Sequence, residues 1–170
     1  MPADLPNGTA WYALRTRSRH EKRVRDQLAN RGLEPFLPLV TRWRRWQDRR
    51  TQVAFPLFPG YCFARFPLRE RLAILTAHGV VQILGNHDGP VSVPEAEIEG
   101  VRRLVTSTLP VDPHPYLREG AWVEVIHGPL AGLQGILLRK GARARLVISV
   151  RLIEQAVSVN LDADAVSPIR

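Results

Sequence analysis

The sequence has one cysteine, Cys62, among its 170 residues. One cysteine cannot form a disulfide within the chain, and it excludes a cysteine-rich zinc site. No apolar run approaches the roughly 20 residues of a membrane-spanning helix, and the N-terminus lacks a basic segment followed by an apolar one. We therefore expect a cytoplasmic protein with no membrane contact, no bound metal and no cofactor.

Motifs that would indicate catalysis are also missing. The chain has no phosphate-binding glycine loop, no Gly-x-Ser-x-Gly turn, no metal-spaced His/Cys cluster and no paired-carboxylate motif. The remaining catalytic alternative is Cys62 as a nucleophile with His78 or His87 as its base. Cys62 lies in an apolar segment, where a small buried side chain is the expected role of a cysteine. We predict that the protein is not an enzyme.

Positive charge is abundant and concentrated in one segment. The net charge is +8, and residues 15–50 hold 12 of the 24 Lys and Arg but only four of the 16 Asp and Glu. That segment therefore carries the whole excess. Such a local excess is typical of a surface that binds nucleic acid or another polyanion, although basic charge also serves solubility alone. No helix-turn-helix or zinc-finger pattern accompanies it.

Residues 42–50 are the densest part of this basic segment, with five arginines and two tryptophans in nine residues. Because so polar a stretch is not expected in a core, it predicts the tip of a β-hairpin. Guanidinium groups neutralise phosphates, and indole rings stack on bases. The alternative is that the arginines stack on the tryptophans and stiffen a hairpin that binds nothing.

An aromatic and apolar segment, residues 55–63, follows the hairpin with the sequence Phe-Pro-Leu-Phe-Pro-Gly-Tyr-Cys-Phe. Its prolines lack the N–H that a central strand needs, and its glycine permits a bend. We predict a turn that displays Phe58 and Tyr61 as an exposed apolar docking site beside the arginines. The alternative is that these aromatic side chains belong to the core.

The first hundred residues predict an α+β domain, an antiparallel sheet with helices packed on it. Strands are expected at residues 11–16, 52–55, 61–66 and 80–84, and helices starting at residues 18, 68 and 94. Ser18 and Glu21 have the spacing of a capping box at the start of the first helix. In the second helix, Leu72 and either Leu75 or Thr76 are expected to face the core.

Proline-rich residues 110–115 predict a stiff linker that belongs to neither neighbouring domain. Beyond it, short strands are expected at residues 122–126, 135–138, 144–153 and 156–161. So small a sheet leaves its edges and one face uncovered unless it closes, so we predict a small β-barrel. The β-branched residues of this region favour strands over helices.

Three motifs occur in order: Trp11-Tyr12, then Phe58-Pro59-Gly60-Tyr61, then residues 120–135 with a Gly-Pro-Leu-Ala-Gly centre that is similar to a KOW motif. Through them the chain resembles the NusG family of transcription elongation factors over nearly all its length. The Pro-Leu-Phe-Pro turn and the arginine-rich hairpin resemble the specialised, RfaH-like antitermination paralogues. We expect a disordered leader at residues 1–9, a polymerase-binding domain of the NusG type at 10–108, a linker at 109–117 and a five-stranded KOW barrel at 118–170.

The resemblance implies a monomeric factor that binds RNA polymerase at its clamp, suppresses pausing or termination and contacts upstream or non-template DNA. It would be cytoplasmic and associated with the nucleoid during transcription. Polymerase contact is implied for Trp11, Tyr12, Phe58, Pro59, Gly60 and Tyr61, and for Arg69, Glu70 and Arg71 on the other side of the polymerase cleft. DNA contact is implied for Arg17, Arg31, Arg42, Arg44, Arg45, Trp46, Arg49 and Arg50.

The KOW domain of the family recruits a further partner, which the resemblance implies is Rho or a small-subunit ribosomal protein. Leu152 and Ile153 occupy the turn that presents apolar residues to it, and Glu154 and Gln155 replace the small-then-basic pair that usually follows. The alternative function is a KOW protein that binds RNA or the ribosome directly. In that case charge reversal at Arg143 and Arg145 would abolish binding.

Overall fold

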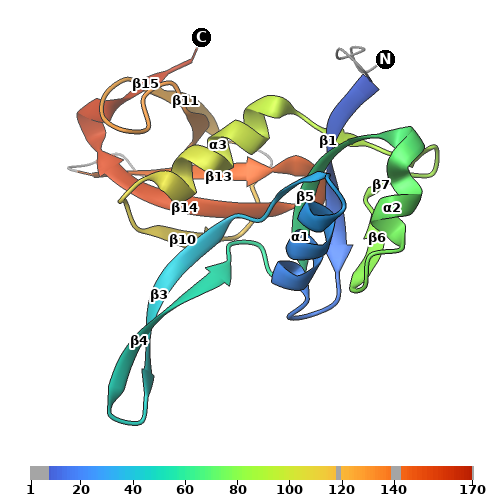
Figure 1. The fold of residues 1–170 in the computed structure, drawn as a ribbon. Helices are drawn as coiled ribbons and strands as arrows, with labels where there is room; N and C mark the ends of the chain where they lie inside the picture. The colour runs from blue at the N-terminus through green and yellow to red at the C-terminus, as the bar shows by residue number, and fades with distance from the viewer. Residues whose placement is uncertain (1–7, 118–119, 139–142, 170) are drawn as a thin grey trace. The chain divides into compact units, whose positions relative to one another are not determined.

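The computed structural model describes residues 8–117, 120–138 and 143–169, which form two compact units, one up to Pro94 and one from Glu95 (Figure 1). Most of the expected leader lies outside the described residues. Thr9, which was expected to belong to it, begins the first strand.

The first unit has the expected mixture of an antiparallel sheet and short helices. The main sheet has the strand order β2-β5-β1-β6, and β9 also pairs with β1. The elements of this unit are β1 (Thr9–Thr16), α1 (Glu21–Asn30), β2 (Glu34–Phe36), β3 (Leu39–Trp46), β4 (Arg49–Pro56), β5 (Tyr61–Pro67), the 3₁₀ helix η2 (Leu68–Glu70), α2 (Arg71–Leu75), β6 (Val80–Ile83), β7 (Gly85–Asn86), β8 (Gly89–Pro90) and β9 (Ser92–Val93).

Strand β1 is the centre of this sheet and is buried on both faces from Trp11 to Leu14. Because side chains alternate along a strand, Leu14 shares a face with Tyr12. On that face lies the core that Val24 and Leu28 of α1 complete. The sheet therefore holds the first motif, Trp11-Tyr12, in the interior.

The second helix is shorter than expected and is turned differently. The chain enters α2 through η2, and Ile74 is the buried residue of α2. Because neighbouring residues of a helix are about 100° apart, an inward Ile74 turns Leu72 and Leu75 away from the core. Leu72 is 68% exposed and Leu75 is also exposed, so the expectation that they face inward is wrong.

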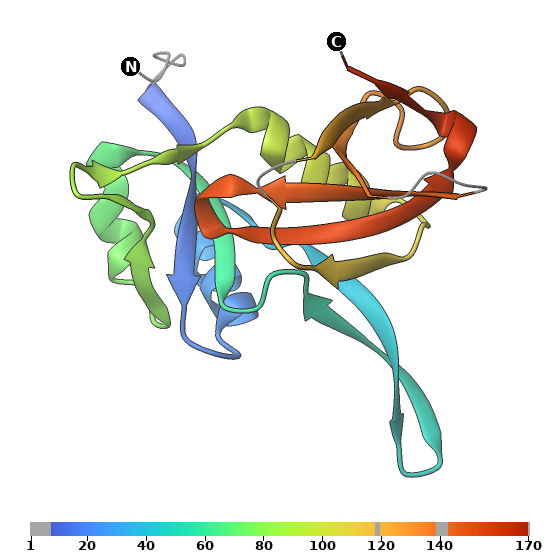
Figure 2. The same ribbon diagram turned by 180° about the vertical axis from the view of Figure 1, so that it is seen from behind.

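Strands β3 and β4 form a separate two-stranded hairpin that pairs only with itself among the described residues. Leu39 lies opposite Pro56 at its base, and Trp46 lies opposite Arg49 at its tip. Figures 1 and 2 show it extending away from the rest of the first unit. Every residue from 41 to 52 is exposed, as the polar sequence predicted.

The second unit is one helix and a six-stranded antiparallel sheet with the order β10-β14-β13-β12-β11-β15. The predicted strands are confirmed, but the five-stranded barrel is not, because no pairing among the described residues joins β10 to β15. The elements are α3 (Glu95–Thr106), β10 (Val111–His114), β11 (Ala121–Val125), β12 (Gln134–Leu137), β13 (Arg143–Val150), η3 (Arg151–Ile153), β14 (Gln155–Asp162), η4 (Ala163–Ala165) and β15 (Val166–Pro168).

The expected proline-rich linker contains strand β10, so it is an element of the second unit. Val111 pairs with Val159, and the ladder continues to His114 opposite Ala156. Pro113 is tolerated because β10 is an edge strand, where a missing N–H breaks no ladder on the open side. The division at Pro94 and Glu95 also differs from the predicted boundary, since α3 belongs with the second unit.

In the part of the chain that the structure describes, every helix is too short or too polar to cross a membrane.

Candidate functional site

The Phe58–Tyr61 turn is held by hydrogen bonds to β1 and α1. The Gly60 N–H donates to the Glu21 carboxylate at 2.8 Å, and the Gly60 carbonyl accepts from the Thr16 N–H at 2.8 Å. Gly60 has a φ of 86°, a conformation that favours glycine. Within the turn, the Tyr61 N–H donates to the Phe58 carbonyl. The turn is therefore a fixed part of the fold.

The predicted capping box is wrong, because the Glu21 carboxylate binds the turn instead. Helix α1 begins after His20, and no side chain caps its first turn among the described residues. Glu21 is buried, with its carboxylate bonded to Gly60 instead of to an N–H of its own helix. The acidic residue at the start of α1 thus positions the turn.

A row of aromatic rings lies on the side of the sheet opposite the α1 core. Trp11 contacts Phe36 with ring centroids 6.2 Å apart, and Phe36 contacts Phe63 at the same separation. Phe58 continues the row, edge-on to Phe63 at 6.4 Å. Such edge and offset contacts stabilise buried rings. Phe58 is therefore 2% exposed, and Trp11 is equally buried.

The expectation of an exposed Phe58 is wrong. Trp11 and Tyr12, for which direct polymerase contact was implied, are buried as well. Tyr12 packs against Phe66 at 4.8 Å between ring centroids, and burial raises the pKa of its phenol. Of the predicted docking motif, Pro59 is exposed and Tyr61 is half-buried. The accessible rim of the turn is thus Pro59 and Tyr61, supported from inside by the buried rings.

The second predicted polymerase contact, Arg69, Glu70 and Arg71, is exposed throughout. These residues form η2 and the first position of α2. Leu68 and Leu72 are exposed beside them. This segment therefore combines charged and apolar side chains on one accessible surface.

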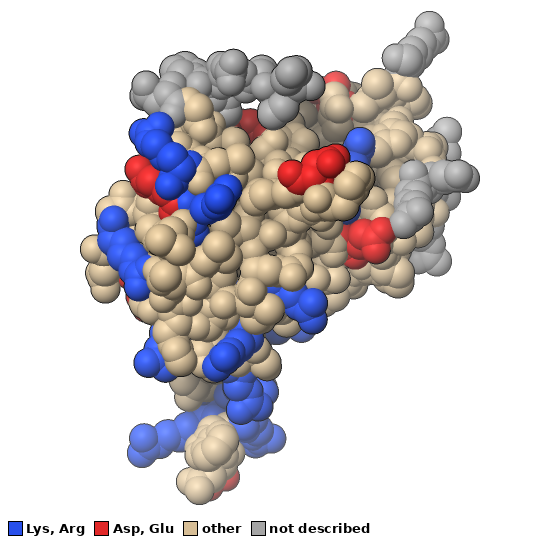
Figure 3. Space-filling view, turned by 90° about the vertical axis from the view of Figure 1, so that its right-hand side faces the viewer, with Lys and Arg blue, Asp and Glu red and all other residues tan. Residues whose placement is uncertain are grey.

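The hairpin brings together six of the predicted DNA contacts. Figure 3 shows basic side chains gathered on the projecting hairpin. Trp46 is 73% exposed, and Trp43, which lies in the same predicted loop, is 66% exposed. Arg44 places its guanidinium over the ring of Phe55, 5.2 Å from the centroid. That contact lies at the base of the hairpin and leaves both indoles accessible.

Arg17 and Arg31, the other predicted DNA contacts, lie outside the hairpin. Both are exposed. Arg31 donates from Nη1 to the Ala73 carbonyl and to Thr76 Oγ1, so it links the end of α1 to α2. Arg31 therefore has a structural role in addition to its exposure.

The turn between β13 and β14 places the predicted partner residues unequally. Ile153 is buried, so the expectation that it is presented to a partner is wrong. Leu152 and Gln155 are half-buried, and Glu154 is exposed with a φ of 49°. The left-handed Glu154 lies in the chain reversal between the two strands, next to the buried Ile153.

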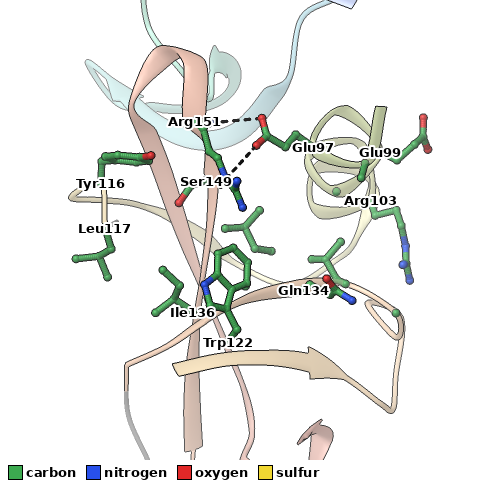
Figure 4. Close-up of a pocket in the computed structure, with 16 residues that line it drawn as sticks. Glu97, Glu99, Arg103, Tyr116, Leu117, Trp122, Gln134, Ile136, Ser149 and Arg151 are labelled. Atoms are coloured by element: carbon green, nitrogen blue, oxygen red, sulfur yellow. Dashed lines mark hydrogen bonds and ion pairs between the residues drawn. The ribbon is translucent and has the colours of Figure 1, made fainter. Parts of the chain in front are cut away.

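A pocket of about 680 Å³ in the second unit was not expected from the sequence. Figure 4 shows it between α3 and strands β11, β12 and β13. Glu97 of α3 forms an ion pair with Arg151 at 3.7 Å, and Arg151 lies over the Trp122 ring. Because Glu97 and Arg151 are 54 positions apart, no local pattern in the sequence brings them together.

Burial raises the pKa of Glu97 above its ordinary value, against the opposing effect of the Arg151 N–H and guanidinium. Arg103 of the same helix donates to the carbonyls of Pro129 and Ala131. These two carbonyls belong to the Gly-Pro-Leu-Ala-Gly centre of the KOW-like segment. Helix α3 thus holds that loop through Arg103 and η3 through Glu97.

Cys62 is buried, and its thiol donates weakly to the carbonyls of Phe36 and Phe63. Burial raises the pKa of the Cys62 thiol to about 12. A thiol with so high a pKa is almost fully protonated at neutral pH, which is unsuited to nucleophilic attack. No group of three or more potential metal ligands occurs among residues 8–117, 120–138 and 143–169.

Comparison with known proteins identifies the fold and the family. The family described as transcription termination factor nusG matches residues 9–102. The transcription termination/antitermination protein NusG of Rickettsia prowazekii is 25% identical over 98% of this chain and 93% of its own length. The corresponding protein of Deinococcus radiodurans is 25% identical over 92% and 97%.

A solved structure that describes a domain interaction in Thermotoga maritima NusG has the same fold. Its TM-score is 0.57 at 20% identity, and the match covers 95% of this chain and 98% of that one.

Proposed function

The chain belongs to the NusG family of non-enzymatic transcription termination and antitermination factors, and on this premise we propose that it binds RNA polymerase during elongation and suppresses pausing or termination. In this proposal the first unit binds the polymerase and the hairpin contacts upstream or non-template DNA. The second unit recruits a further partner.

The observation that carries the proposal is the projecting hairpin. It presents Arg42, Arg44, Arg45, Arg49 and Arg50 together with exposed tryptophans, and Asp48 is its one acidic residue. An extended cationic element without a packing partner gains little for the fold, since its residues bury almost nothing. Its charge and exposed indoles suit contact with nucleic acid.

The rim of the aromatic turn supports docking on the polymerase clamp. Pro59 and Tyr61 are accessible, while Glu21 and Thr16 hold the turn in place through Gly60. A rigid surface loses less conformational entropy on binding than a flexible one. If the clamp is bound only in its closed form, the binding free energy shifts the polymerase away from open, paused states.

The segment from Arg69 to Arg71 supplies the proposed second contact across the polymerase cleft. Exposed Leu68 and Leu72 add an apolar component to it. Two contacts on opposite sides of a cleft would brace it more effectively than one. Neither contact requires a cofactor or a bond to be broken.

The Pro-Leu-Phe-Pro turn and the arginine-rich hairpin favour a specialised, RfaH-like factor over the general one. Leu152, Glu154 and Gln155 are the accessible residues proposed to meet Rho or a small-subunit ribosomal protein. We place the protein in the cytoplasm as a monomer, at the nucleoid during transcription.

Co-purification of RNA polymerase tests the docking surface. Tyr61→Ala should reduce polymerase recovery strongly while leaving the melting temperature nearly unchanged, because Tyr61 is only half-buried. Ile126→Ala, which removes an exposed apolar side chain from the second unit, is the matched control. A pause assay with both variants then connects binding to elongation.

Full polymerase recovery by Tyr61→Ala would reject docking through the turn. If charge reversal at Arg143 and Arg145 abolished binding to RNA or ribosomes while polymerase was never recovered, the alternative KOW function would replace the proposal.

A further inference from the structure

The β3–β4 hairpin has two chemically similar faces. Side chains on a strand alternate, and residues paired across an antiparallel ladder share a face. The pairs Arg44 with Thr51 and Trp46 with Arg49 therefore lie on one side. The pairs Trp43 with Gln52 and Arg45 with Arg50 lie on the other.

We name these sides by their tryptophans. The Trp46 face carries Arg42, Arg44, Trp46 and Arg49, and the Trp43 face carries Trp43, Arg45 and Arg50. The position of Arg44 over Phe55 agrees with this division, because Phe55 pairs with Val40 on the Trp46 face. Each face thus has one indole with arginines beside it.

Neither face packs against the fold along residues 41–52. All of these residues are exposed, and the two indoles are more than 60% exposed. An exposed indole beside guanidinium groups suits an unpaired nucleotide, because the base stacks on the ring while the arginines neutralise the phosphate. Two such faces on one thin ribbon suit two separate strands.

We infer that the hairpin binds a DNA fork, with one unpaired strand on each face of the ribbon. An intact duplex fits the observations less well, because its bases are already stacked and offer no open surface to an indole. A ribbon lying flat in the major groove would leave one of the two tryptophans facing away from the DNA. A fork uses Trp43 and Trp46 together.

The inference rests on the proposed function only for the source of the fork, since a transcribing polymerase separates the DNA strands. The binding itself needs no polymerase. The full chain is therefore tested by fluorescence anisotropy against three synthetic DNAs. These are a fork with two unpaired arms, a blunt duplex of the same paired sequence, and one unbranched single strand.

The fork should bind at least tenfold more tightly than the blunt duplex. Stacking contributes roughly 1–3 kcal/mol per base, so Trp43→Ala and Trp46→Ala should each weaken fork binding by about fivefold or more. On the unbranched strand either face suffices. Each single variant should then lose only about twofold, the statistical effect of losing one of two equivalent sites. The double variant should lose far more.

Trp122→Ala is the matched control, because Trp122 is an exposed indole that an arginine also contacts, in the second unit. It should bind all three DNAs like the wild type. None of these substitutions changes the net charge, so a difference between them is not an electrostatic effect. Circular dichroism should show the same fold and melting temperature for each variant.

Three results would overturn the inference: equal affinity for the fork and the blunt duplex, fork binding that survives loss of both tryptophans, or equal losses by single variants on the fork and on the unbranched strand. The Trp43→Ala/Trp46→Ala variant should still recover polymerase. If the wild type recovers polymerase but binds the fork no more tightly than the blunt duplex, this inference alone is rejected. The proposed docking is tested separately by Tyr61→Ala.

Discussion

The hairpin and the aromatic turn are neighbours in the sequence, yet the structure treats them in opposite ways. Residues 41–52 of the hairpin are exposed on both faces. A few residues later, Phe58 is buried against Phe63, and Gly60 is bonded to both Glu21 and Thr16. The hairpin is thus free to bind, whereas the turn is mainly structural and offers a narrow rim.

This difference shows which sequence signals decide exposure. A run of arginines must stay in water, because burying unpaired charges is too costly. The aromatic residues of the turn have no such constraint, and their positions depend on which rings the sheet places nearby. Charge density therefore predicted that the hairpin is exposed, whereas the aromatic motif did not predict whether its side chains are exposed or buried.

Truncation of Phe58 should give the largest effect on stability. Phe58→Ala removes a fully buried ring from the aromatic row, and such changes cost about 3–5 kcal/mol. Trp46→Ala at the exposed tip should change the free energy of unfolding by less than about 0.5 kcal/mol. Urea denaturation measures both. Equal stability of the two variants would remove the contrast between turn and hairpin.

Removal of the Glu21 carboxylate should have the next largest effect. Glu21→Gln replaces a charged acceptor of the Gly60 N–H with a neutral amide, which should destabilise the fold by about 1–3 kcal/mol. Glu95→Gln, an exposed acidic residue at the start of α3, is the control and should change stability little. If denaturation gave Glu21→Gln the same free energy of unfolding as the wild type, the turn would not depend on this bond.

Single hairpin arginines should change the salt dependence of DNA binding more than they change stability. Arg45→Gln should reduce the slope of log affinity against log salt by roughly one, the effect of one lost phosphate contact. Arg71→Gln, an exposed arginine of α2, should leave the slope unchanged. Identical slopes for wild type and Arg45→Gln in a salt titration would exclude a phosphate contact there.

Glu97 gives the smallest expected effect and extends the contrast to a partly buried charge. Its pKa is raised above 4.5, so the folded second unit holds the proton more tightly than the unfolded chain. The stability gained from this proton is present below pH 4.5 and is lost as the pH rises through the raised pKa. Glu97→Gln should remove that pH dependence.

Carboxyl NMR titration checks the cause directly. Arg151 lowers the pKa of Glu97, so Arg151→Ala should raise it further. A lower pKa in that variant would contradict the assignment of burial as the dominant influence.

The fold could be predicted wherever one local pattern decided the outcome. The antiparallel sheet of the first unit, the exposed hairpin and the strands after residue 120 followed from alternation, charge and β-branched residues. The inward side of α2 could not be predicted, because the chain enters this helix through a 3₁₀ turn at Leu68, which changes the side that faces the core. Strand β10 was missed because Pro113 favours a linker but is also tolerated at a sheet edge.

The site was less predictable than the fold, since its contacts join distant parts of the chain. Glu21 reaches Gly60, and Glu97 reaches Arg151, without any spacing rule that connects them. Ile153 is buried beside the left-handed Glu154, and neither feature was apparent from the composition. Only for side chains that had to be exposed, such as the hairpin arginines, could the sequence predict the solvent-exposed environment.

Site-specific photo-crosslinking in a transcription elongation complex tests whether the hairpin contacts DNA while the turn contacts the polymerase. A benzoyl-phenylalanine is placed at position 46 in one variant and at position 61 in another. We expect position 46 to crosslink to DNA and position 61 to crosslink to the polymerase. Crosslinks from position 46 only to protein, or from position 61 only to nucleic acid, would contradict it.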